Sequence, residues 1–237
     1  PEILAYLEKI TAELDTLENA DDRREELREQ YRGMLAEAKG IAAELTEQRR
    51  KAAKQLEGEI VRELSELDMD KVKMRVAVRT GTKLSAHGCD TVTFEISVNP
   101  GEPEKPLSKV ASGGELSRIM LAIKAILADK DQIDTLIFDE IDTGISGEAA
   151  NKVGIKLRCV SKNAQVICVT HLAQIAAMAD NHLFIVKKQE NNKTYTAVHT
   201  LTKDARVREI ARIIGGDDIT PLKLKMAEEM LSRPHES

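Results

Sequence analysis

Two adjacent carboxylates follow a short apolar run in the middle of the chain. The segment TLIFDE places Asp139 and Glu140 directly after four largely apolar residues, a pattern that predicts a buried strand. Carboxylates at the carboxyl end of a strand can divide the work of phosphate hydrolysis, because one can hold Mg²⁺ through water while the other polarises the attacking water. A strand that simply ends in solvent would show the same pair, so the pair alone does not identify a catalytic site.

The next predicted strand also ends in a polar side chain. The segment QVICVT (165–170) is followed by His171, whose ring could contact a terminal phosphate, although a structural or helix-capping histidine is the common alternative. Asp142, in the loop IDTGISG (141–147), could be a turn residue or could lie where two active sites communicate across a dimer. Parallel strands present their carboxyl ends at one edge, so these side chains are expected to share that edge.

A serine and two glycines precede the apolar pattern of a helix. Ser112 and Glu115 form the S-x-x-E pattern of a capping box, which satisfies two amides of the first helical turn. Gly113 and Gly114 leave the backbone bare at the positive end of the helix, where an anion such as phosphate can bind. The two roles are compatible.

The elements that must position these residues alternate between strand and helix. A helix after Ser112, the strand 134–140, a helix at 148–158, the strand 165–170 and a helix at 172–179 predict parallel βαβ units and the α/β class. Upstream, KVKMRVAV (71–78) and TVTFEISV (91–98) predict two half-buried strands separated by a loop that contains HGCD. Downstream, HLFIVKK and KTYTAVHT are expected to form a hairpin that closes the sheet, before two short helices near 204–214 and after Pro221.

The first 69 residues have a different pattern. Apolar residues of a first series lie four and three positions apart, as in a coiled coil: Ile3, Leu7, Ile10, Leu14 and Leu17. After a phase break at 19–24, a second, longer series follows: Leu27, Tyr31, Met34, Ala38, Ile41 and Leu45, then Ala52, Leu56, Ile60, Leu64 and Leu67. If fully helical, this segment would extend about 100 Å, and its narrow apolar seam favours a coiled coil over an amphipathic helix that packs on its own domain. The partner strand of the coiled coil is then missing from this chain or comes from another one.

Composition excludes some classes of protein. The 237 residues include 35 Lys and Arg against 40 Asp and Glu, a net charge of −5, so any contact with DNA would have to be local. Cys89, Cys159 and Cys168 follow no C-x-x-C spacing, which favours reduced thiols in a cytoplasm. No signal peptide and no long uncharged apolar run is present, so a cytoplasmic protein without membrane contact is expected.

The motifs, in their order along the chain, resemble those of a known family. ASGGE, LIFDE, IDTGISG and VTH resemble the signature motif, Walker B motif, D-loop and switch histidine of the ABC-type ATPase heads of SMC-like proteins. The longer stretches NPGEPEKPLSKVASGGELSRIMLAIKAI, FDEIDTGISGEAA and VTHLAQIAAMAD resemble the RecN family, bacterial SMC-like proteins of DNA double-strand-break repair, over essentially the whole chain. The implied fold is an ABC-type ATPase head lobe, a P-loop NTPase-like sheet with flanking helices, at 70–237, carrying a coiled-coil arm at 1–69.

The resemblance also implies how the helix start is used. In such heads ATP lies between two protomers, and the signature helix of one reaches the γ-phosphate that the other holds. Ser112 and the amides of Gly113 and Gly114 would make this contact, with Glu115 in the same nucleotide-binding set.

The carboxylates and the histidine receive the remaining roles, on another face of the same lobe. Asp139 would position Mg²⁺, and Glu140 would act as general base on the attacking water. His171 would sense the γ-phosphate, and Asp142 would couple the two sites of the dimer.

One motif of such heads is missing. No Gly-Lys-Ser or Gly-Lys-Thr occurs, so the P-loop that cradles phosphates is not in this chain. The resemblance places that loop in an amino-terminal half, and the chain is interpreted as the carboxyl-terminal portion, with a returning coil arm and the second lobe of the head. Expected partners are the amino-terminal lobe and arm of the same protein, a second head and DNA, in a nucleoid-associated protein. Two alternatives stay open: a structural tether with degenerate ATPase motifs, and a Rad50- or SbcC-like head that serves a nuclease.

Overall fold

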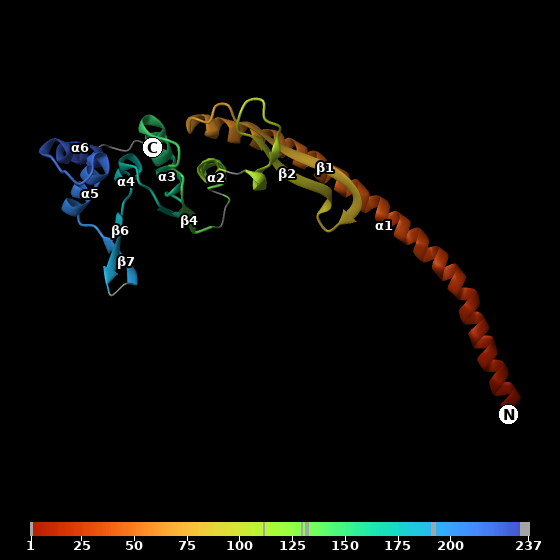
Figure 1. Cartoon of the computed structure of the whole chain (residues 1–237). Helices are drawn as coiled ribbons and strands as arrows, with labels where there is room; N and C mark the ends of the chain where they lie inside the picture. The colour runs from red at the N-terminus through yellow and green to blue at the C-terminus, as the bar shows by residue number, and fades with distance from the viewer. Residues whose placement is uncertain (1, 111, 129, 131–132, 191–192, 233–237) are drawn as a thin grey trace. The chain divides into compact units, whose positions relative to one another are not determined.

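The computed structural model describes residues 2–110, 112–128, 130, 133–190 and 193–232 (Figure 1). The chain forms two compact units, one containing Pro1–Lys54 and Val76–Thr93, the other Gln55–Arg75 and Phe94–Ser237. The predicted boundary after residue 69, between a coiled-coil arm and a head lobe, stays a prediction.

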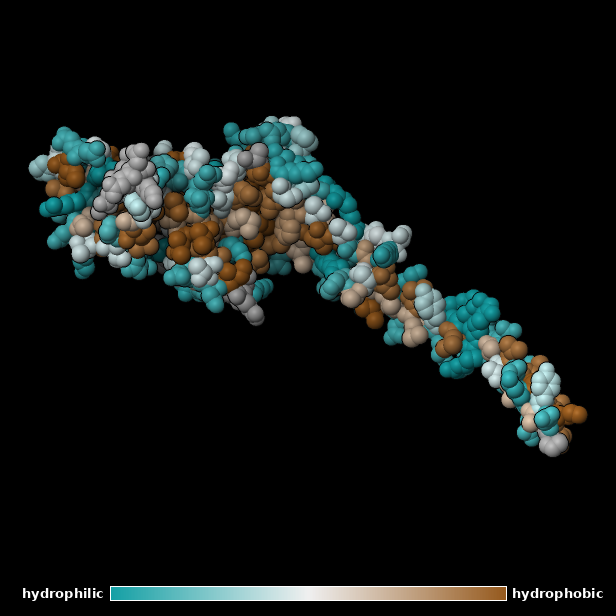
Figure 2. Space-filling view, turned by 60° about the horizontal axis from the view of Figure 1, so that its bottom comes forward, coloured by the Kyte–Doolittle hydropathy of each residue, from teal (hydrophilic) through white to brown (hydrophobic). Residues whose placement is uncertain are grey.

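The first element is one uninterrupted helix of 65 residues, α1 (Glu2–Glu66). It continues through residues 19–24, where the apolar phase breaks, because that stretch contains no Pro or Gly and a phase break changes only the apolar face. Figure 2 shows apolar side chains at the surface at intervals along this helix. Along the amino-terminal part of the predicted seam the apolar residues are exposed: Ile3, Leu7, Ile10, Leu14, Leu17, Leu27, Tyr31, Met34, Ile41 and Leu45. Ile60, Leu64 and Leu67, at the carboxyl-terminal end of the predicted seam, are instead buried in the core of the second unit. The amino-terminal seam is thus free to meet a partner.

A three-stranded sheet follows in the order β1 (Lys73–Ser85), β2 (Gly88–Ser97) and β3 (Lys105–Pro106). The predicted loop between the first two strands is wrong in length, because the strands extend through most of residues 79–90. The turn is instead closed locally: the Ser85 hydroxyl donates to the Gly88 carbonyl (2.8 Å) and accepts from the His87 amide (3.2 Å), while Gly88 adopts a φ of +83°.

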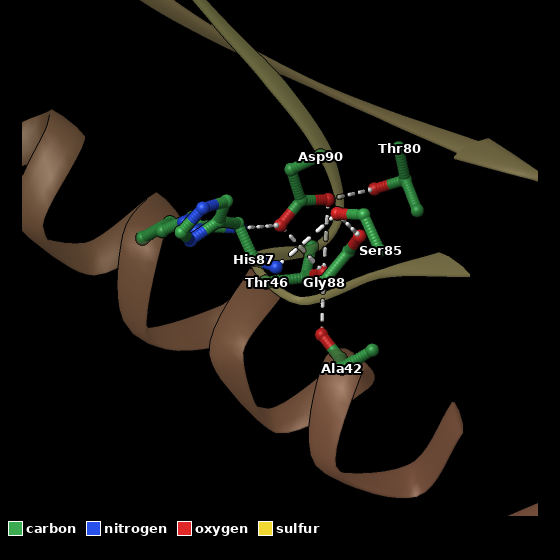
Figure 3. A network of polar contacts seen from close by, with 8 residues as sticks. Ala42, Thr46, Thr80, Ser85, His87, Gly88 and Asp90 are labelled. Atoms are coloured by element: carbon green, nitrogen blue, oxygen red, sulfur yellow. Dashed lines mark hydrogen bonds and ion pairs between the residues drawn. The ribbon is translucent and has the colours of Figure 1, made fainter. Parts of the chain in front are cut away.

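A buried carboxylate joins this turn region to α1 within the first unit (Figure 3). Both carboxylate oxygens of Asp90 lie 2.9 Å from the Thr46 hydroxyl, and they also accept from Thr80 (2.9 Å) and from Arg49 (3.0 Å). Burial would raise the pKa of Asp90, but these hydrogen bonds together bring its pKa below the ordinary value. The folded state therefore favours the charged carboxylate at this point.

The second unit contains the predicted βαβ arrangement. After a short 3₁₀ turn (Leu107–Lys109) come α2 (Gly113–Leu127), β4 (Thr135–Phe138), α3 (Gly147–Val160) and β5 (Gln165–Cys168). The strands β4 and β5 are parallel, from Thr135 opposite Gln165 to Phe138 opposite Cys168, which confirms the parallel pairing. Their core is formed by aliphatic residues from several elements, among them Ile60, Leu64, Ile96, Ile119, Leu121, Ile141 and Val153.

The remaining elements are α4 (Ala173–Ala177), β6 (Leu183–Glu190), β7 (Lys193–Thr200), α5 (Lys203–Gly215) and α6 (Pro221–Ser232). The hairpin prediction is confirmed, since β6 and β7 pair antiparallel from Leu183 opposite Thr200 to Glu190 opposite Lys193. The expectation that the hairpin closes the β4–β5 sheet is wrong: among the described residues it forms a sheet of its own, because its two strands satisfy each other locally. A small second core joins α4, α5 and α6 through Ala173, Ala176, Ile210, Ala211 and Ala227.

Candidate functional site

The start of α2 has the predicted cap. Ser112 has extended backbone angles, and its hydroxyl accepts a hydrogen bond from the Glu115 amide at 3.4 Å. Ser112 and Gly113 are exposed, whereas Gly114 is buried. The exposed first turn of α2 can therefore offer backbone donors to an anion while the next residue is already packed against the chain.

Two side chains of α2 hold the loop that follows β4. The Ser117 hydroxyl donates to the Asp139 carbonyl (2.8 Å), and the Arg118 guanidinium donates to the carbonyls of Ile141 (3.2 Å) and Thr143 (2.9 Å). Arg118 is only 7% exposed, and burial lowers the pKa of its guanidinium. The sequence patterns do not predict this role of Arg118. Their one sign of it is a charged residue beside the buried Ile119, on the apolar face of the helix.

The two glycines are explained by the same loop. A Cβ on Gly113 would lie 2.2 Å from Oε2 of Glu140, and a Cβ on Gly114 would lie 2.9 Å from the Thr143 carbonyl oxygen and 3.0 Å from that of Glu140. The expectation that the helix start and the carboxylates occupy different faces of the lobe is therefore wrong for the single chain. The bonds from Ser117 and Arg118 hold the loop against the first turn of α2, where a side chain at position 114 would meet backbone atoms and a side chain at position 113 would meet the Glu140 carboxylate.

Glu140 has an unusual backbone. Its φ is +57°, in the left-handed region that residues with a side chain rarely adopt, and its amide donates to Oδ1 of Asp139 at 2.9 Å. Such a conformation costs on the order of 1–3 kcal/mol and persists when surrounding contacts impose it. Both carboxylates are exposed at the end of β4, as the sequence predicts.

Asp142 and His171 meet at the carboxyl ends of β4 and β5. The carboxylate of Asp142 is buried, and its Oδ2 lies 2.6 Å from the Thr170 hydroxyl, 2.8 Å from the His171 amide nitrogen and 3.0 Å from Nδ1 of His171. The His171 side chain is 73% exposed. Asp142 is thus engaged inside its own chain, and its predicted role in coupling two sites stays a prediction.

Cys168 lies at the same edge of the sheet. Burial, together with the charges of Asp142 and Asp139, raises the pKa of its thiol to about 12. The thiol therefore stays protonated at neutral pH and is a poor nucleophile. All three cysteines of the chain are free.

The described residues contain no group of three or more His, Cys, Asp or Glu that could hold a metal ion by themselves. Mg²⁺ in nucleotide sites is commonly bound by one or two carboxylates together with phosphate oxygens and water. Asp139, exposed and with Oδ1 accepting the Glu140 amide, fits such a single ligand. It does not form a complete site.

Comparison with known proteins gives close relatives. No protein-family model matches the chain. It is 42% identical over 247 residues to the DNA repair protein RecN of Bacillus subtilis (strain 168), a match that covers 98% of this chain and 43% of that protein. It is 40% identical over 228 residues to the DNA repair protein RecN of Haemophilus influenzae, covering 96% of this chain and 41% of that protein. The chain spans about two fifths of the length of the curated relatives it matches.

Similar solved structures are heads of Smc proteins. The Smc head domain with a coiled coil and joint from Pyrococcus yayanosii is 20% identical, with a TM-score of 0.48 over 69% of this chain and 29% of that chain. The Smc head domain with an extended coiled coil from Pyrococcus furiosus, bound to the C-terminal domain of ScpA, is 20% identical, with a TM-score of 0.45 over 70% of this chain and 39% of that chain. In the part of the chain that the structure describes, no helix is both long and apolar enough to span a bilayer.

Proposed function

Because the chain belongs to the RecN family of DNA repair proteins over the part of their length that it matches, we propose that it is the signature-bearing half of an ATP-hydrolysing repair protein. One observation carries the proposal. The start of α2, the Asp139–Glu140 pair and the Asp142–His171 pair converge on one loop at the carboxyl ends of two parallel strands. This edge is where α/β proteins bind nucleotides.

Each residue then has a role that its position supports. Glu140 is the general base for the attacking water, since its carboxylate is exposed at the strand end. The first turn of α2, with Ser112, contacts the γ-phosphate bound by a second head. His171 contacts, from the β5 edge, the γ-phosphate of the nucleotide on which Glu140 acts. Mg²⁺ bound with ATP would supply positive charge to the phosphate oxygens, with Asp139 as one of its ligands.

The chain supplies only part of this site. Ile137 is 70% exposed on β4, and Ile167 and Val169 are also exposed at β5. Parallel sheets are ordinarily covered on both faces, so an uncovered apolar face of β4–β5 supports a missing lobe of the head. We assign this cover to the amino-terminal lobe of the same protein, which would also bring the P-loop, and we assign the exposed seam of α1 to its coil arm. DNA would be bound by the assembled protein.

Reconstitution tests the incomplete site. We expect the isolated chain to bind ATP weakly and to hydrolyse it negligibly, because no segment of it cradles the β- and γ-phosphates. Addition of the amino-terminal half should restore both. Tight ATP binding with normal turnover by the isolated chain would disprove the proposal, and absence of turnover in the reconstituted protein would favour the structural-tether alternative.

A second experiment tests the assignment of Ser112 to the partner's nucleotide. In the intact protein, Glu140→Gln should retain ATP binding and lower hydrolysis by about 10²–10⁴-fold, the range for loss of a general base. Ser112→Arg should allow ATP binding to each head and prevent the two heads from docking. Thr202→Arg, at the capped start of α5 outside the site, is the matched control and should change neither property.

A mixture of the two variants shows whether Ser112 acts on the nucleotide of the partner head or on that of its own chain. If Ser112 serves the partner's nucleotide, a heterodimer of Ser112→Arg and Glu140→Gln collects both defects in one composite site and leaves the other intact. Phosphate release should then recover in part, and light scattering with ATP should detect dimers. If Ser112 and Glu140 instead serve one nucleotide within a chain, as the contact between Gly113 and Glu140 permits, the mixture stays inactive.

A further inference from the structure

We propose that Asp142 is a positioning residue that fixes the tautomer of His171, with the proton on Nδ1, and so leaves Nε2 as the ring atom presented to the nucleotide site. The role in ATP hydrolysis rests on the proposed function, whereas the tautomer itself is a property of the chain. All contacts involved lie within one compact unit.

The hydrogen bonds around Asp142 show which group donates in each contact. The Thr170 hydroxyl oxygen accepts from the Leu172 amide at 3.0 Å, so its single proton is free to be donated to Oδ2 of Asp142 at 2.6 Å. The His171 amide donates to the same oxygen at 2.8 Å. Oδ2 therefore already accepts two donors, as a charged carboxylate oxygen does.

The third contact then decides the state of the ring. Nδ1 of His171 lies 3.0 Å from Oδ2 in an ion-pair contact, and an oxygen that carries no proton attracts Nδ1 only when Nδ1 carries one. Because the two ring nitrogens lie on opposite edges of the imidazole, Nε2 faces away from Asp142 in a side chain that is mostly exposed. In the neutral ring Nε2 accepts a hydrogen bond, which suits a water molecule, and in the protonated ring it donates, which suits a phosphate oxygen.

The backbone of Asp142 is held from the other side by α2. Arg118 donates to the carbonyls of Ile141 and Thr143, the two residues that flank Asp142 in the chain. The backbone that carries the buried carboxylate is thus held in place. Residues 141–143 of the loop link α2, the signature helix, to the His171 ring. A side chain that acts on His171 in this way positions it and does not itself touch the substrate.

The tautomer can be read directly in the intact protein labelled with ¹⁵N-histidine. Long-range ¹H–¹⁵N spectra distinguish the two ring nitrogens, and His171→Gln identifies the signals of this residue among the histidines. We expect Nδ1–H in the unmodified protein. Asp142→Ala removes the acceptor, so the ring should change to the Nε2–H form that a free side chain prefers. Asp142→Asn retains the shape with a weaker, uncharged acceptor and should give a mixture.

Thr170→Val is the matched control. It removes one hydrogen bond from Asp142 and keeps both the side-chain volume and the contact with Nδ1, so the Nδ1–H form should persist. The proposal is overturned if the unmodified protein shows Nε2–H, or if both Asp142 variants retain the Nδ1–H form. Far-ultraviolet circular dichroism checks that each variant is folded, and Asp142→Asn serves where Asp142→Ala does not fold.

Steady-state kinetics separate this inference from the proposed function. Asp142→Ala should lower kcat for ATP hydrolysis by about 10–100-fold, the range for partners that orient a functional group, with KM nearly unchanged. An unmodified protein with the Nδ1–H tautomer but no ATPase activity would disprove the proposed function and leave the positioning of His171 standing. Normal kcat in a variant with the Nε2–H tautomer would overturn the catalytic part of the inference.

Discussion

Two neighbouring glycines of α2 should respond in opposite ways to the same substitution. In Gly113→Ala the new Cβ meets Oε2 of Glu140 at 2.2 Å, which is the far end of a flexible and exposed side chain. In Gly114→Ala the new Cβ meets the carbonyl oxygens of Thr143 (2.9 Å) and Glu140 (3.0 Å), which belong to the backbone. The first obstacle can rotate away. The second cannot, because Arg118 holds the Thr143 carbonyl at 2.9 Å.

The free energies of unfolding follow from these distances. Alanine is better than glycine in the middle of a helix by about 0.5–1 kcal/mol, and Gly113 is the first residue of α2, so Gly113→Ala should leave the stability unchanged or raise it by less than that amount. Overpacking against fixed backbone costs about 1–3 kcal/mol, so Gly114→Ala should be destabilising after the helical gain is subtracted. Thermal unfolding, with hydrogen exchange of peptides from α2 and from residues 139–143, measures both changes.

The ATPase activities of these two glycine variants should not follow their stabilities. Gly113→Ala displaces the Glu140 carboxylate, so hydrolysis in the intact protein should fall while the fold is unharmed. In a Glu140→Gln background the same substitution should lower hydrolysis little further, since contacting residues that act together are not additive. The reasoning is refuted if Gly113→Ala destabilises the protein as much as Gly114→Ala, or if its effect on hydrolysis is fully additive with that of Glu140→Gln.

Three other properties can be measured on the same protein. Iodoacetamide at pH 8 should alkylate the exposed Cys159 and spare Cys168, whose pKa is raised to about 12, and peptide mass spectrometry would show the opposite if Cys168 were reactive. Burial lowers the pKa of His182 below 6.5, so the unfolded chain takes up the proton first; the melting temperature should fall as pH drops below 6.5, and less so in His182→Gln. Asp90→Asn should speed amide exchange in residues 73–97, because Arg49 loses a charged partner; unchanged exchange would mean that the network of Figure 3 does not hold the strands.

Local patterns were sufficient for most of the fold around the site. Apolar runs of four residues identified β4 and β5, and the strand–helix alternation gave their parallel pairing. The positions of Glu140 and His171 at one edge follow from that pairing alone. The S-x-x-E pattern likewise predicted the cap at Ser112. These features depend on residues close together in sequence or on a rule of sheet topology.

Features that depend on contacts across long stretches of sequence were not predictable. The role of Arg118 requires knowing that residues 141–143 pass beside α2, more than 20 positions along the chain. The burial of Asp142 requires the register of β5 against β4, because its partners are Thr170 and His171. In both cases the residue is polar, and no periodicity in the sequence indicates its partner. For an apolar residue in a helix or strand, the spacing of the apolar positions indicates which face is buried.

The loop 139–143 is anchored to two elements, α2 and the segment after β5, and this arrangement constrains how the proposed site can work. Ser117 and Arg118 of α2 hold the carbonyls of the loop, and Thr170 and His171, after β5, hold the buried carboxylate of Asp142. Between these anchors lies Glu140, whose left-handed backbone depends on both. A shift of α2 when its first turn meets a phosphate would therefore move the general base and the imidazole together. Contact with one nucleotide and chemistry on another would then be linked through the hydrogen bonds of a single loop.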